Sequence, residues 1–190
     1  MLLWFYFSLH CGHGPHYETL LMKKVLTIKD PQGRLAEARC EQRIRAHYGN
    51  LQGIWRKNNV VDGSMSDFRI DGKPPDEIDK LGSNMSFYKR FTIPLSKGEE
   101  RDVIWTFQAT DSLLNAEEAF LHDTTIGTKL LEMEVVFPDE RGFISASFHE
   151  EVGGENSNPL PGLEKIGHKK LVARKESPKP GYTYRIDWTW

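Results

Sequence analysis

The residues best suited to bind a metal lie near the N-terminus, where three histidines surround a cysteine. His10, Cys11, His13 and His16 form the pattern H-C-x-H-x-x-H, and thiolate and imidazole groups are ligands of zinc and copper. Structural zinc sites usually take two pairs of ligands from separate turns, whereas these four residues lie close together among glycine and proline. A closed tetrahedral shell is hard to build from them. We expect a flexible histidine-rich leader here, and no metal or other cofactor in the protein.

Two groups of histidine and glutamate could carry acid–base chemistry, but neither has a specific spacing. Glu118 and His122 stand four residues apart in the one segment that we expect to be helical, so both side chains could share a helix face. Surface pairs of this kind are commoner than catalytic ones. His149 is followed by Glu150 and Glu151, which is typical of the polar end of a strand.

Cys40 has charged neighbours that could lower a thiol pKa and make the sulfur a nucleophile. The alternation of the segment argues against this interpretation, because Cys40 is in phase with apolar residues. The opposite phase holds Glu37, Arg39, Glu41, Arg43 and Arg45. We therefore expect a buried structural thiol on one face of a strand and a solvated ladder of charges on the other.

A calcium loop is suggested by Asp62, Ser64 and Ser66, where oxygen ligands alternate. The pattern then fails, because Asp67 stands where a glycine is needed and Lys73 where a bidentate glutamate is needed. The sequence also contains no H-E-x-x-H, no G-x-S-x-G, no glycine-rich phosphate loop and no paired C-x-x-C. These absences do not exclude an enzyme, but the interpretation leans toward a non-catalytic protein.

The candidate binding residues are aromatic and basic. Tyr48, Trp55 and Arg56 lie in or next to a run of basic residues between Arg39 and Lys57 that holds a single acid, Glu41. Aromatic faces and cations together could accept a protein, a glycan or a nucleic acid. Nucleic acid is disfavoured, because the net charge is −2 and residues 62–79 are rich in acids.

Two further aromatic candidates, Trp188 and Trp190, close the sequence. If the strand from Tyr182 to Trp190 lies at a sheet edge, it could pair with another chain or form a homodimer. The alternative is that these aromatic side chains fill the core.

Alternation with a period of two residues dominates the chain and predicts strands. It is clearest in the last segment, where Tyr182, Tyr184, Ile186, Trp188 and Trp190 share one face. Similar patterns cover residues 24–29, 36–46, 64–70, 87–95, 103–109, 131–137 and 144–148. One stretch, from Ser112 to His122, predicts a short helix. Strands without intervening helices predict an all-β, mostly antiparallel β-sandwich of immunoglobulin-like type with one short helix, and a closed β-barrel is the alternative.

Length and composition fit one domain. The 190 residues are 38% hydrophobic and 27% charged, with two cysteines, so we expect a single β-sandwich over residues 22–190 in the cytoplasm. The apolar run from Leu2 to Leu9 is far shorter than the roughly 20 residues of a membrane span. One interpretation of residues 1–21 is that they are a non-native leader and that the natural chain begins at Met22.

The function that this sequence favours is a non-catalytic binding module, which recognises a protein partner or neighbouring domain through loops or an edge strand. The alternative is a carbohydrate-active hydrolase or glycan-binding domain that uses paired surface carboxylates, such as Glu132 and Glu134, together with aromatic residues. A third reading is that the chain is a piece of a larger protein.

Overall fold

The computed structural model describes residues 16–59, 62–81, 84–124, 127–152 and 155–190, and these form strands and no helix. In chain order the strands are β1 (Tyr17–Ile28), β2 (Leu35–Ala46), β3 (Leu51–Asn59), β4 (Ser64–Ile70), β5 (Glu77–Leu81), β6 (Asn84–Leu95), β7 (Glu100–Thr110), β8 (Glu117–Asp123), β9 (Thr128–Val136), β10 (Ser145–Val152), β11 (Glu155–Pro159), β12 (Leu163–Ile166), β13 (Lys170–Glu176) and β14 (Tyr182–Thr189). The described residues hold no helix that could cross a membrane.

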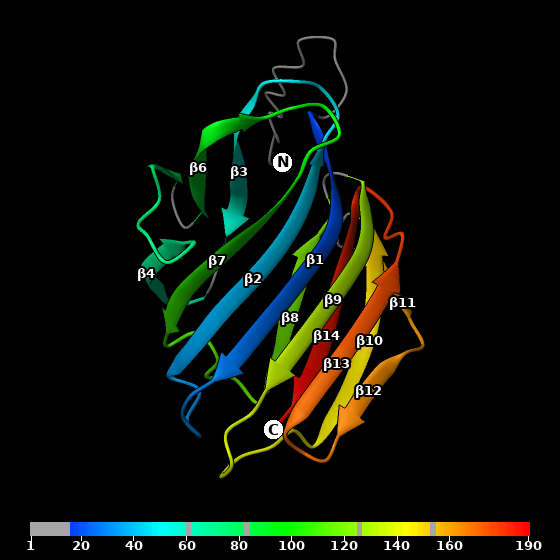
Figure 1. Cartoon of the computed structure of the whole chain (residues 1–190). Coiled ribbons are helices and arrows are strands. Elements are labelled where there is room, and N and C mark those ends of the chain that lie inside the picture. The colour runs from blue at the N-terminus through cyan, green and yellow to red at the C-terminus, as the bar shows by residue number, and fades with distance from the viewer. Residues whose placement is uncertain (1–15, 60–61, 82–83, 125–126, 153–154) are drawn as a thin grey trace, which may run out of the picture.

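Three sheets make up the fold (Figure 1). The largest has the order β12-β13-β9-β1-β2-β7-β4, the second the order β11-β10-β14-β8, and the smallest the order β3-β6-β5. The pairs are antiparallel except for β1 with β9, which is parallel. None of the sheets closes into a barrel, so the all-β sandwich prediction is confirmed and the barrel alternative is not.

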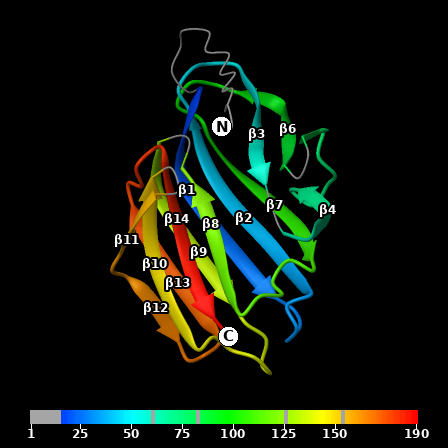
Figure 2. The same cartoon turned by 180° about the vertical axis from the view of Figure 1, so that it is seen from behind.

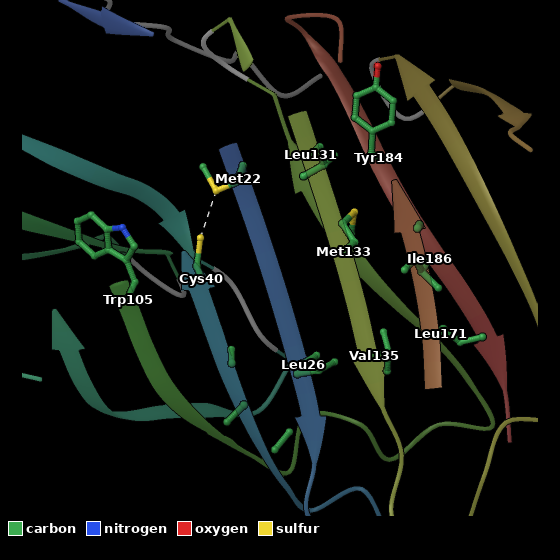
Figure 3. Close-up of a cluster of buried hydrophobic side chains, with 14 of the residues drawn as sticks. Met22, Leu26, Cys40, Trp105, Leu131, Met133, Val135, Leu171, Tyr184 and Ile186 are labelled. Atoms are coloured by element: carbon green, nitrogen blue, oxygen red, sulfur yellow. Dashed lines mark hydrogen bonds between the residues drawn. The ribbon is translucent and has the colours of Figure 1, made fainter. Parts of the chain in front are cut away.

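The main core lies between the seven-stranded and four-stranded sheets, which Figure 2 shows layered one against the other. Alternate residues of the facing strands point into this space, and Figure 3 shows Leu26, Val135 and Leu171 from the large sheet opposite Ile186. Each of these side chains is buried. Burial of one large aliphatic side chain contributes about 1.5–3 kcal/mol to folding.

The alternation predicted around Cys40 is confirmed. Cys40 is buried, and the opposite face of β2 carries ion pairs such as Arg43 with Asp102 at 2.8 Å and Arg45 with Glu100 at 2.6 Å. These pairs are solvent-exposed, so each contributes little to stability. The charges nevertheless keep this face of the large sheet in water.

The short helix predicted over Ser112 to His122 is wrong. Its first residues form a loop in which Asp111 has a φ of 55°, and the rest is the strand β8. This strand pairs along its length with β14, with His122 opposite Tyr184. The apolar residues that imitate a helix face are divided between the loop, where Leu113 is buried, and the strand. Pairing with a distant strand overrides the weak local preference.

The first strand begins before Met22. Residues 17–21 already pair with β2, although a register shift interrupts the ladder between Thr19 and Leu21. Thr19 is buried and accepts a hydrogen bond from the side-chain amide of Gln42 at 3.1 Å. The domain boundary predicted at Met22 therefore falls inside β1.

Candidate functional site

An aromatic pair lies on the outer face of the three-stranded sheet. Trp55 of β3 is directly opposite Tyr88 of β6, and their ring centroids are 5.1 Å apart with the planes tilted by 35°. The Trp55 side chain stays 36% exposed. Together with Tyr48, which is 50% exposed in the preceding turn, these residues are called the aromatic patch below.

A glycine makes room for this pair. The Tyr88 ring lies so close to Gly53 that any Cβ at position 53 would overlap its phenol group and the backbone carbonyl of Lys89. The turn before β3 closes with Asn50 in the left-handed region at a φ of 65°, which asparagine tolerates better than most residues. Local backbone geometry thus places the aromatic patch at one end of the small sheet.

A pocket opens beside the aromatic patch. Its cavity volume is about 210 Å³, and it is lined by His16, Tyr48, Gly49, Asn50, Leu51, Gln52, Gly53 and Tyr88. The His16 imidazole packs edge-on against the Tyr48 ring with centroids 6.3 Å apart. Aromatic walls with a few amide groups are typical of a surface that binds another molecule.

Arg56 does not belong to this surface, although it follows Trp55 in the sequence. Successive side chains of a strand point to opposite faces, so Arg56 turns inward while Trp55 faces solvent. Its Nη1 lies 3.7 Å from the Met22 sulfur. The sequence grouped Tyr48, Trp55 and Arg56, and the structure separates Arg56 from the other two.

Beneath the small sheet, three basic side chains approach one another from three different strands. We call Lys24 of β1, Arg56 of β3 and His122 of β8 the basic cluster. Burial, followed by the charge of Arg56, lowers the pKa of Lys24 to about 7. The Lys24 ammonium donates to the carbonyl of Leu121 and lies 4.7 Å from the centroid of the Phe120 ring.

His122 is the most enclosed member of the basic cluster. Only 6% of its surface is exposed, and its Nε2 is buried with no hydrogen-bond partner among the described residues. Burial, followed by the charges of Lys24 and Arg56, lowers its pKa well below 6.5. The sequence paired His122 with Glu118, but Glu118 instead accepts a hydrogen bond from the Asn115 backbone at 2.7 Å.

Trp188 and Trp190 lie in the core. Trp188 is 2% exposed, and the Trp190 indole donates to the Asn115 carbonyl at 2.8 Å. The strand β14 that carries Trp188 pairs with β10 on one side and β8 on the other, so it is not a sheet edge. The alternative that these aromatic residues fill the core is the one that the structure supports.

A serine, a histidine and an aspartate that the sequence analysis did not group meet on the outer face of the four-stranded sheet. His149 Nε2 lies 2.8 Å from Ser147 Oγ and 3.8 Å from Asp187 Oδ2. In a nucleophilic triad the acid approaches the nitrogen remote from the serine, whereas here both groups approach Nε2, and Nδ1 is buried without a partner among the described residues. Arg185 also holds the Asp187 carboxylate. The sequence shows Ser147 and His149 two residues apart, and this spacing could have drawn attention to them. The three residues nevertheless do not have the geometry of a catalytic triad.

The remaining candidates are distributed over the molecule. Glu132 and Glu134 lie on the outer face of the large sheet in ion pairs with Arg174 at 3.9 Å and Lys170 at 2.8 Å. Asp62, Ser64 and Ser66 are exposed, and the two serines lie in β4. His10, Cys11 and His13 fall outside the described residues. Within the described part of the chain, no three histidine, cysteine or acidic side chains gather so as to hold a metal ion.

No model of a known protein family matches the chain, and no curated protein matches its sequence. Its fold is similar to part of two hydrolases of known structure. An M1 zinc metallopeptidase from Deinococcus radiodurans matches with a TM-score of 0.54 and 12% identity over 90% of this chain and 42% of that one. Yeast LTA4 hydrolase matches with a TM-score of 0.53 and 8% identity over 90% of this chain and 29% of that one. This chain therefore spans less than half the length of either protein, and the likeness concerns the fold.

Proposed function

We propose that this protein is a non-catalytic β-domain that docks onto a hydrolase, either as a neighbouring domain or as a separate chain, through the aromatic patch. The observation that supports it most is the fold comparison, in which this fold makes up only part of much longer chains named as hydrolases. A fold that recurs as one part of larger enzymes can serve as a domain that docks onto the rest of such an enzyme.

The aromatic patch supplies the chemistry for docking. Trp55 and Tyr48 expose large rings on one side of the small sheet, and the pocket beside them could receive a partner side chain. Tryptophan and tyrosine are enriched among the residues that dominate the binding energy of protein interfaces. We expect Trp55 to be an anchor, with the polar groups of the pocket forming the rim.

A photo-crosslinking experiment tests this proposal. A benzophenone amino acid at position 48 would be activated in lysate, and the crosslinked protein would be identified by mass spectrometry. The variants Trp55→Ala and Ile144→Ala would be compared at the same position of the label. Ile144 is the matched control because it is 78% exposed and directly precedes β10, a strand of the four-stranded sheet, whereas the patch lies on the three-stranded sheet.

The expected result is a single dominant product that contains a hydrolase domain, which is lost in Trp55→Ala and kept in Ile144→Ala. Equal crosslinking by both variants would show that the patch is not the docking surface. Turnover of aminopeptidase or glycosidase substrates by the purified chain alone would contradict the non-catalytic assignment.

A further inference from the structure

One side of β3 is an open sheet edge beside the pocket. β3 comes first in the order β3-β6-β5, so it pairs with β6 on one side and with no described strand on the other. Backbone N–H and C=O groups of a strand point alternately to its two sides, so every second residue of β3 turns these groups to the open side. An unpaired edge of this kind is a template for pairing with another chain.

The pocket lies along this edge and is not confined to one face of the sheet. Successive residues of a strand alternate between its faces, so a pocket on one face is lined by every second residue. This pocket is instead lined by three consecutive residues of β3, namely Leu51, Gln52 and Gly53. The register with β6 shifts between Leu51 and Gly53, so Gln52 has no opposite residue in β6, and it is exposed. The pocket therefore reaches the unpaired side of β3.

Gly53 allows an aromatic ring from β6 to line the pocket across the strand. Tyr88 belongs to β6, yet its hydroxyl oxygen lies 2.5 Å from the position that a Cβ on residue 53 would take. The Tyr88 ring thus extends over the backbone of β3, and it is part of the pocket wall. A glycine inside a strand often marks a place where a ligand or another backbone comes close.

The lining of the pocket is uncharged apart from one imidazole. Among the described residues that line it there is no lysine, arginine, aspartate or glutamate. Its walls are the rings of His16, Tyr48 and Tyr88 and the side-chain amides of Asn50 and Gln52. Burying a charge without a partner of opposite sign is costly, whereas aromatic walls favour apolar and aromatic side chains. The lining therefore matches an uncharged side chain.

We propose that the partner contributes an extended segment, which pairs as an added strand with the open side of β3 and places an apolar or aromatic side chain in the pocket. This inference rests on the docking function proposed above and names the chemistry of the segment that docks. Main-chain hydrogen bonds to β3 supply affinity, and the pocket supplies selectivity. Gly53 and Trp55 are two residues apart, so alternate side chains of the added strand lie beside the pocket and beside Trp55.

Two synthetic peptides test the pairing of main chains. The first is acetyl-Thr-Val-Phe-Val-Thr-amide, which is uncharged and rich in strand-forming residues. The second has the same side chains but carries N-methyl groups on its three central residues, so it lacks their N–H donors. Each is titrated into the full chain while the backbone amide resonances of Gln52 and Gly53 are followed by NMR. We expect saturable shifts with the first peptide and binding weakened about tenfold or more with the second.

A third peptide tests the selectivity of the pocket. It has glutamate in place of the central phenylalanine, and we expect it to bind about tenfold or more weakly than the first peptide. The variants Trp55→Ala and Ile144→Ala are titrated with the first peptide, and only Trp55→Ala should weaken its binding. Unmoved Gln52 and Gly53 resonances with the first peptide, or equal binding of all three peptides, would overturn the proposal.

The peptide titrations and the crosslinking experiment fail in different ways. If crosslinking depends on Trp55 but the first peptide does not bind, the docking function stands and the added strand is rejected. If the first peptide binds at β3 but crosslinking is the same in Trp55→Ala and Ile144→Ala, β3 stands as a peptide-binding edge and docking onto a hydrolase through the aromatic patch is rejected.

Discussion

The side-chain ammonium of Lys24 donates to the backbone carbonyl of Leu121, and this contact joins the middle of the seven-stranded sheet to the open edge of the four-stranded sheet. A lysine on an open edge is a common way to prevent further strand pairing. Here the lysine comes from the facing sheet, so the same contact both covers the edge and ties the two layers together.

The first prediction concerns the pH dependence of stability. The pKa of Lys24 is about 7 in the folded protein, against an ordinary value of 10.5. Between these pH values the unfolded chain holds a proton on Lys24 that the folded chain lacks, so the free energy of unfolding rises with pH. This group adds at most about 1.4 kcal/mol per pH unit. Urea unfolding at about pH 7.5 and at about pH 9.5, both inside this window, measures the slope of the unfolding free energy with pH.

Lys24→Met should lose this slope, because the methionine carries no proton in either state. Lys23→Met removes a positive charge one residue earlier and should keep the wild-type slope. Parallel curves for the wild type and Lys24→Met would show that the pKa of Lys24 is not lowered by folding.

A glycine-to-alanine pair tests the packing of the aromatic patch. Gly53→Ala places a Cβ against the Tyr88 ring and the Lys89 carbonyl, and should cost about 1–3 kcal/mol through overpacking. Gly49→Ala alters the same pocket, but its Cβ meets nothing within 4 Å, so stability should change by less than about 0.5 kcal/mol. Thermal unfolding of both variants gives the comparison, and equal melting temperatures would contradict the close approach of Tyr88 to Gly53.

Two tryptophans should respond differently to truncation. Trp188→Ala empties a core position and should destabilise the fold by about 3–5 kcal/mol. Trp55→Ala removes an exposed ring whose main partner is Tyr88, and should cost about 1 kcal/mol. Denaturant unfolding followed by circular dichroism measures both. A larger loss for Trp55 than for Trp188 would mean that the core has been placed wrongly.

The start of β1 can be tested by truncation. A chain that begins at Met22 lacks the Thr19 hydroxyl that accepts from buried Gln42, and leaving that amide unpaired should cost about 1–3 kcal/mol. It also lacks the Glu18 carboxylate, which pairs with Arg45 and Lys129. A chain that begins at His16 is the control and should keep the stability of the full chain. Equal stability of the two truncated chains would show that residues 17–21 add nothing to the fold.

The strand interpretation succeeded where alternation was long and regular. Cys40 is buried and its charged neighbours are solvated, as the period of two residues predicted. It failed between Ser112 and His122, because Leu113, Phe120 and Leu121 imitate a helical face over a short stretch. The pairing that makes this segment a strand is with β14, which lies some sixty residues later, at Tyr184 opposite His122.

The candidate site was predictable only in part. Tyr48 and Trp55 are exposed as the binding interpretation required, but Tyr88, which stacks on Trp55, carried no signal that linked it to them. The sequence could not decide whether Trp188 is buried in the core or lies on a strand at a sheet edge. A row of side chains that faces the core and a row that binds a partner show the same alternation. The strand order decided between them.

The sequence by itself determined which side chains of a strand point the same way, because that direction follows from the local backbone, in which successive residues alternate. Only the tertiary structure decided which strands are neighbours and which edge stays open, since strand pairing depends on contacts between residues far apart in the chain. Lys24, Arg56 and His122 each fit an ordinary strand when taken alone. Their proximity beneath the small sheet follows from how the three sheets pack, and their spacing along the sequence does not predict it.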